Sequence, residues 1–208
     1  GVAAAAGWSP GSVNSPGFWV TDLDAMEVLN DGEHDTYFEV FLDLTARGYL
    51  VTPTGVSDAH GHFNGPAGIN GTWIGTDQDV GALSNDDLRD AYRTGDVIVG
   101  LGVFLELSQP PGSTFTQATT LDVTAHSAPY AQVDRLLLYE NGTLVQTIDG
   151  TTGSFVIDPP ADTVYVVTAE GDTPMQPVTS RRPWAATNVF LFDRGGDGWS
   201  APLPPLEE

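Results

Sequence analysis

The stretch Leu138-Tyr-Glu-Asn-Gly-Thr-Leu-Val145 predicts the clearest local structure in this chain. Apolar residues flank Asn141-Gly142, the favoured two-residue turn of a β-hairpin, in which both turn positions take a positive φ. Further short runs alternate apolar and polar residues and are separated by Pro, Gly and Asn turns. The runs are Thr120–Ala125, Val133–Tyr139, Leu144–Ile148, Ser154–Ile157 and Thr163–Thr168. Because alternation at period two buries one side of each strand, the pattern predicts an immunoglobulin-like β-sandwich.

The residues before this part have the pattern of an α/β unit. Ala25–Leu29 is a short apolar run, His34–Arg47 carries apolar residues at helical spacing before a glycine, and Tyr49–Thr54 predicts a second strand. Strand, helix and strand in this order are typical of a βαβ unit. A glycine-rich stretch, residues 61–79, predicts a long loop. Ser84–Thr94 predicts a helix that begins with capping residues.

The domain division is expected near residue 109. Val97–Leu107 is strand-like with interruptions at two glycines, and the composition then changes at Gln109-Pro-Pro-Gly-Ser113. We therefore expect an α/β domain over residues 1–108. The β-sandwich, with an acidic tail rich in glycine and proline, is expected over residues 109–208.

The motif Thr54-Gly-Val-Ser-Asp-Ala-His-Gly61 places a carboxylate, Asp58, two residues from an imidazole, His60. Both follow the predicted strand, at the end where α/β folds collect their ligands and catalytic groups. A carboxylate oxygen and an imidazole nitrogen suit Zn, Mn or Fe. The alternative is that Asp58 caps the turn and His60 is an ordinary surface histidine. Both interpretations stay open on spacing alone.

A family resemblance favours the interpretation of Asp58 and His60 as metal ligands. The segments Asp24–Asn30, Thr52–Gly61, Leu88–Leu105 and Arg182–Leu191 occur in an order that resembles the polymerase and histidinol phosphatase (PHP) superfamily of metallohydrolases. The similarity is to its exported carbaryl-hydrolase-like branch (CehA/McbA type). The resemblance implies the end of a distorted α/β barrel, with Asp58 and His60 as ligands of the final Asp-x-His motif.

The same resemblance exposes missing ligands. The family's centre also needs an amino-terminal His-x-His pair and further His and Glu ligands, whereas this chain has four histidines and only His60 and His62 are close. The chain begins at Gly1 without an initiator methionine. We therefore expect the carboxyl-terminal portion of a longer hydrolase, inactive alone, that associates with the missing part or with itself. Its catalytic residues cannot be assigned.

Six other side chains are weaker candidates. Glu27 could hydrogen-bond a metal ligand or pair with an arginine on the strand face. His34 and His62 could bind metal or substrate, although loop histidines are usually solvated; His126, in the predicted sandwich, is more easily explained as structural. Asp193 and Asp197 resemble the start of a calcium loop, but Gly195 and Pro204 stand where further ligands belong. A plain acidic turn is the alternative.

Charge narrows the possible partners. The sequence holds 28 acidic and 7 basic residues, all of the latter arginine, for a net charge of -21. Such a chain repels nucleic acid and anionic lipid. It has no cysteine, and no apolar run approaches the roughly 18 residues of a membrane span. The composition fits a secreted, periplasmic or cell-surface protein.

Two functional hypotheses follow. The first is part of a metal-dependent hydrolase that cleaves a phosphoester, ester or carbamate bond of a small-molecule substrate. The second is a non-catalytic secreted or surface module in which the sandwich serves adhesion, assembly or glycan binding. The fold alone does not distinguish them, because one fold hosts many functions.

Overall fold

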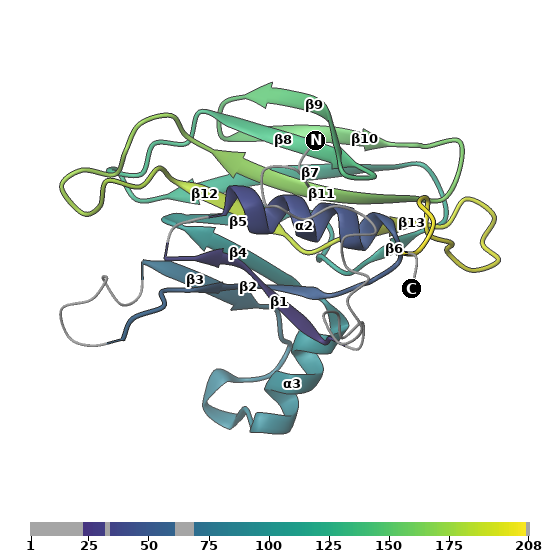
Figure 1. Cartoon of the computed structure of the whole chain (residues 1–208), viewed down its shortest axis with the longest axis horizontal. Coiled ribbons are helices and arrows are strands. Elements are labelled where there is room, and N and C mark those ends of the chain that lie inside the picture. Colours follow the sequence, from purple (N-terminus) through teal and green to yellow (C-terminus); the bar gives the residue numbers. More distant parts are fainter. Residues whose placement is uncertain (1–22, 32–33, 61–68, 207–208) are drawn as a thin grey trace.

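The computed structural model describes residues 23–31, 34–60 and 69–206, and it is mostly β-sheet (Figure 1). The described helices are α2 (Asp35–Ala46), α3 (Asn85–Thr94) and the 3-10 turn η1 (Val80–Ala82). The strands before residue 109 are β1 (Ala25–Asn30), β2 (Thr52–Val56), β3 (Asn70–Ile74), β4 (Val97–Leu101) and β5 (Val103–Leu107). The later strands are β6 (Thr114–Phe115), β7 (Thr119–Ser127), β8 (Arg135–Glu140), β9 (Thr143–Asp149), β10 (Thr152–Ile157), β11 (Thr163–Glu170), β12 (Trp184–Thr187) and β13 (Phe190–Phe192).

A large sheet forms the middle layer of the molecule. Its strands run in the order β3-β4-β12-β11-β8-β9, each antiparallel to its neighbours. β12 and β13 both pair with β11 on the same side, β12 with its carboxyl-terminal half and β13 with its amino-terminal half. β6 lies parallel to β13. The sheet therefore draws strands from both ends of the chain.

A second sheet, in the order β10-β7-β5, covers one face of the large sheet and makes the structure a β-sandwich on that side. Alternate residues of both sheets meet in one buried core, as a sandwich requires. The largest fully buried members are Phe155, Phe190, Phe192, Leu105, Leu121, Leu136 and Ile157.

The other face of the large sheet is covered by α2 and by β1 and β2 (Figure 1). β1 and β2 are parallel and α2 connects them, so the predicted βαβ unit is confirmed. The apolar stripe of α2 buries Phe38, Phe41 and Leu42 against the sheet residues Val164, Val166 and Trp184. Burial of this stripe, more than helix propensity, holds α2 in place.

Local turn chemistry accounts for two other confirmed elements. Asn141 and Gly142 take φ values of 49° and 82°, and they connect β8 to β9 as the Asn-Gly turn predicts. Ser84 and Asp87 form a reciprocal capping box at the start of α3, while Gly95 ends it with φ 84°. These features satisfy helix-end groups that would otherwise lack partners.

Parts of the strand prediction differ from the structure. The stretch 61–79, predicted as a loop, contains β3, whose alternation is hidden by Asn70 and Gly71. Val97–Leu107 breaks only at Gly102, where φ is 73°, because Gly100 lies inside β4. Strand pairing also crosses residue 109, since β4 pairs with β12 and β5 pairs with β7.

The sandwich core generates a stability prediction. Phe155→Ala removes a fully buried ring of β10 and should lower the free energy of unfolding by about 3–5 kcal/mol. The neighbouring Val156 is 71% exposed, so Val156→Ala should cost less than about 1 kcal/mol. Urea denaturation measures both. Equal effects of the two substitutions would contradict the packing of β10 described above.

Candidate functional site

The Asp-x-His motif lies just after β2, at the carboxyl end of the parallel β1–β2 pair. Asp58 has a φ of 49°, in the left-handed region that Asp tolerates better than most residues. Its Oδ1 lies 2.8 Å from Nε2 of His60, and the two side chains are 51% and 75% exposed. The structure thus brings the two predicted ligands together on an open surface.

This end of the β1–β2 pair is fixed by side chains of β3. Nδ2 of Asn70 donates to the Val56 carbonyl at 2.6 Å. The Thr72 hydroxyl accepts from the Gly55 amide at 2.9 Å and donates to the Gly55 carbonyl at 3.1 Å. Side chains therefore complete the free edge of β2, and they hold the backbone two residues before Asp58.

Asp58 and His60 are hydrogen-bond partners of one another. The 2.8 Å contact joins His60 Nε2 to Asp58 Oδ1, so an ion held by these two atoms would replace this hydrogen bond. Within residues 23–31, 34–60 and 69–206, no group of three or more His, Cys, Asp or Glu side chains could hold an ion. Asp58 and His60 therefore do not form a complete ligand set within the described residues, and their role as metal ligands stays a prediction. His62 lies outside the described residues.

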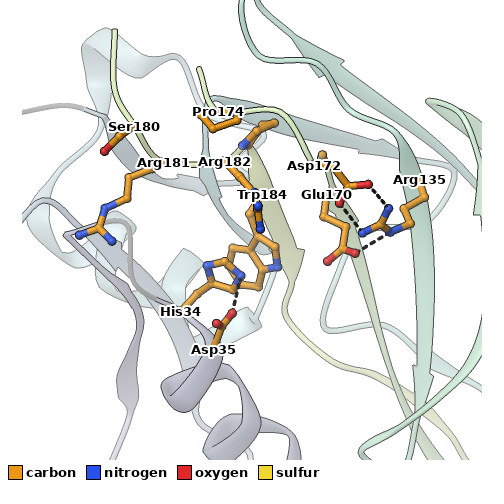
Figure 2. A pocket seen from close by; sticks show the side chains of 12 residues that line it. His34, Asp35, Arg135, Glu170, Asp172, Pro174, Ser180, Arg181, Arg182 and Trp184 are labelled. Carbon is orange, nitrogen blue, oxygen red and sulfur yellow. Dashed lines mark hydrogen bonds and ion pairs between the residues drawn. The ribbon is translucent and has the colours of Figure 1, made fainter. Parts of the chain in front are cut away.

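A cavity of about 450 Å³ opens beside the amino end of α2 (Figure 2). His34 stacks on Trp184 with ring centroids 4.2 Å apart, and its Nε2 lies 3.2 Å from Asp35 Oδ1. Three of the chain's seven arginines, Arg135, Arg181 and Arg182, also line this cavity. Three carboxylates, those of Asp35, Glu170 and Asp172, line the cavity as well, so it contains side chains of both charges.

Arg135 forms a rigid wall of this cavity. Its guanidinium donates to Glu170 at 2.6 Å and to both carboxylate oxygens of Asp172 at 2.8 and 2.9 Å (Figure 2). These charge-assisted bonds raise the pKa of Arg135 and hold the pKa of Asp172 below its usual range. The fork is therefore ionised throughout the neutral range.

The cavity and the Asp-x-His motif lie at the same end of the βαβ unit. Arg181 lies 3.8 Å from the Asp31 carboxylate, and the Asp31 amide donates to the Val56 carbonyl at 3.2 Å. Asp31 thus contacts both Arg181 of the cavity wall and the end of β2, the strand that precedes the Asp-x-His motif. Sequence reasoning found His34 but missed the arginines, for which the adjacent pair Arg181-Arg182 before Trp184 was the available signal.

The weaker candidates have local partners. Oε2 of Glu27 accepts from Asn30 at 2.8 Å on an exposed surface, and the role of Glu27 toward a metal ligand stays a prediction. His126, on β7, lies with its Nε2 2.7 Å from Oε2 of Glu106 on β5. This contact ties two paired strands on the outside of the small sheet.

The Asp-Gly turn near the carboxyl end is organised by hydrogen bonds. The two oxygens of Asp193 accept from the amides of Gly196 and Gly198 at 2.8 and 2.9 Å, and the side chain is buried. Asp197 is exposed. These bonds explain the turn without an ion, and the calcium site stays a prediction.

Comparisons with protein-family models, with curated proteins and with solved structures found no match for this chain. In the part of the chain that the structure describes, neither α-helix has the length and apolar character of a membrane span.

The Arg135 fork can be tested by titration. Asp172 has a lowered pKa, so the fork stabilises the fold above the unfolded pKa of this carboxyl, and that contribution is lost as the pH falls through the folded value. Arg135→Gln should raise the pKa of Asp172 toward its ordinary 3.8. Carboxyl-detected NMR titration measures the shift. Arg89→Gln, on exposed α3, is the control and should leave Asp172 unchanged.

Proposed function

We propose that the chain is the carboxyl-terminal portion of a metal-dependent hydrolase of the PHP type, with Asp58 and His60 as two of its metal ligands. In this proposal, the βαβ unit is the end of a distorted PHP barrel, and the sandwich is its immunoglobulin-like companion. The observation that carries the proposal is the 2.8 Å pair of Asp58 and His60 at the carboxyl end of a parallel strand. This is the end at which α/β enzymes place their ligands.

The remaining ligands must come from residues outside the described part or from an associated polypeptide. When bound, a divalent metal supplies polarisation of the scissile bond and an activated water. Asp58 supplies negative charge to the site. It also lies where it can orient the imidazole of His60, while Asn70 and Thr72 hold the strand beneath them. Zn, Mn and Fe are the metals that this donor pair suits.

The arginine-lined cavity supports a substrate site beside the metal. Arg182 can donate to an acidic or carbonyl oxygen of a phosphoester, ester or carbamate, and Arg181, which lies 3.8 Å from the Asp31 carboxylate, adds positive charge beside it. Arg135 is already engaged by Glu170 and Asp172, so it acts as scaffold rather than as the binding group. A small-molecule substrate is proposed on these grounds, and nucleic acid is disfavoured by the net charge of -21.

The proposal extends to location and assembly. The excess of acidic side chains and the absence of lysine from the sequence fit a secreted, periplasmic or surface protein. Within the described residues the ligand set is incomplete, and an upstream part of the same protein or another copy could supply the missing ligands.

Metal binding tests the proposal directly. Calorimetric titration of the chain with Zn²⁺ and Mn²⁺ in about 150 mM salt, where long-range charge is screened, should give one site per chain. Asp58→Asn and His60→Gln should each weaken binding at least tenfold, because each removes one of two donors. The matched control is His126→Gln. It alters a second exposed His–carboxylate pair, with a 2.7 Å contact, and should leave the affinity unchanged.

Equal weakening by all three substitutions would mean that the acidic surface binds metal non-specifically, and it would overturn the site. Loss confined to the Asp58 and His60 variants supports it. In a longer protein that contains the upstream part, Asp58→Asn should then lower the rate of p-nitrophenyl ester or phosphoester hydrolysis at least 100-fold. Full activity of that variant would leave the non-catalytic module as the better hypothesis.

A further inference from the structure

A second cavity, of about 500 Å³, lies away from the arginine-lined one, between the carboxyl end of β3 and the edge strand β5. Trp73, Phe104 and Asp96 line it, and Pro110 and Pro111 form one side. A shallower hollow of about 290 Å³ shares Asp96 and both prolines and adds Asp77. The two hollows adjoin at these shared residues, and together they are called the groove below.

The aromatic wall of this groove is built into the sheet. A side chain at Gly100 would come within 2.8 Å of the Trp73 ring, and one at Gly71 would come within 3.3 Å. The indole therefore rests on two glycines, as no larger residue would allow. Phe104 supports it from the edge, with ring centroids 5.7 Å apart. Trp73 nevertheless remains 38% exposed, and Phe104 remains 37% exposed.

Asp96 is the unusual polar group of the groove. It is partly buried, yet within the described residues its carboxylate accepts no hydrogen bond and forms no ion pair. Burial and the nearby Asp77 carboxylate raise its pKa. Gly75 makes room for it, because a Cβ there would meet Asp96 Oδ2. The carboxylate of Asp96 therefore lines the groove without a partner from the described chain, and a cation in the groove could pair with it.

The charge of the groove selects the ligand. Asp77, Asp96 and Glu106 line it, and no arginine does. A basic side chain beside the groove is His126, whose Nε2 faces Glu106 at 2.7 Å and whose ring lies 6.5 Å from that of Phe104. Glu106 is thus partly compensated, whereas Asp96 and Asp77 are not. An electron-rich indole face beside unpaired carboxylates attracts an organic cation.

We propose that this groove binds an organic cation, an alkylammonium or guanidinium group, over the face of Trp73 and against the carboxylate of Asp96. The cation would form the ion pair that Asp96 lacks within the chain, and the indole would provide the cation–π contact. A neutral sugar would use the aromatic face but would leave the two carboxylates uncompensated. This inference does not depend on the metal site, which uses the opposite face of β3.

The test uses Nα-acetyl-arginine methylamide as the probe and its neutral isostere, Nα-acetyl-citrulline methylamide, as the matched ligand. NMR of the five indole N–H signals should show a saturable shift of Trp73 with the arginine probe. Citrulline should bind at least tenfold more weakly. Trp73→Ala and the isosteric Asp96→Asn should each weaken arginine binding at least tenfold. Asp149→Asn removes an exposed charge on β9, at the opposite edge of the large sheet, and should have no effect.

Several results would overturn the proposal. Equal binding of arginine and citrulline would make the groove a neutral polar site, and a shift of Trp73 with methyl glucoside but not with arginine would make it a sugar site. Binding of Ca²⁺ at Asp96 without any response to arginine would make it a metal site. Butylammonium, a primary alkylammonium without a peptide group, tests whether the cationic group alone is sufficient for binding. Binding of either cation, lost in Asp96→Asn, supports the proposal.

Discussion

Two-sided burial of β11 is the constraint on which the rest of the structure depends. From Thr163 to Ala169 every residue of this strand is buried, because α2 covers one face and the small sheet covers the other. Val164 and Val166 pack in the core beneath α2, and Tyr165 and Val167 pack in the core between the two sheets. A one-residue slip of the strand would exchange these two sets. Its register with β8, β12 and β13 therefore sets the position of both outer layers.

Much of the fold could be predicted where local chemistry decides it. The Asn141-Gly142 turn, the capping box at Ser84 and the helical spacing of α2 act within a few residues, so the sequence displays them. The strands that were missed are set by distant partners. β12 is buried at all four positions, from Trp184 to Thr187, and so shows no alternation. β13 is only three residues long, and its pairing with β11 defines it.

The candidate sites also differ in whether neighbouring or distant residues form them. Asp58 and His60 are two residues apart, so the sequence could predict their proximity, and the 2.8 Å contact agrees with that expectation. The arginine-lined cavity joins residues from α2, β8 and the segment that follows β11. No local pattern brings Arg135 beside Glu170 and Asp172. Their meeting follows from the antiparallel register of β8 and β11, in which Arg135 lies opposite Glu170.

The edge strand β3 connects the Asp58–His60 pair to the aromatic groove. Its Asn70 and Thr72 side chains hold the end of β2, and the alternate residue Trp73 points to the other face and forms the groove wall. A single short strand thus positions both regions, although neither shares a lining residue with the other. Any displacement of β3 would move the backbone before Asp58 together with the indole, so the two sites have a common mechanical support while differing in chemistry.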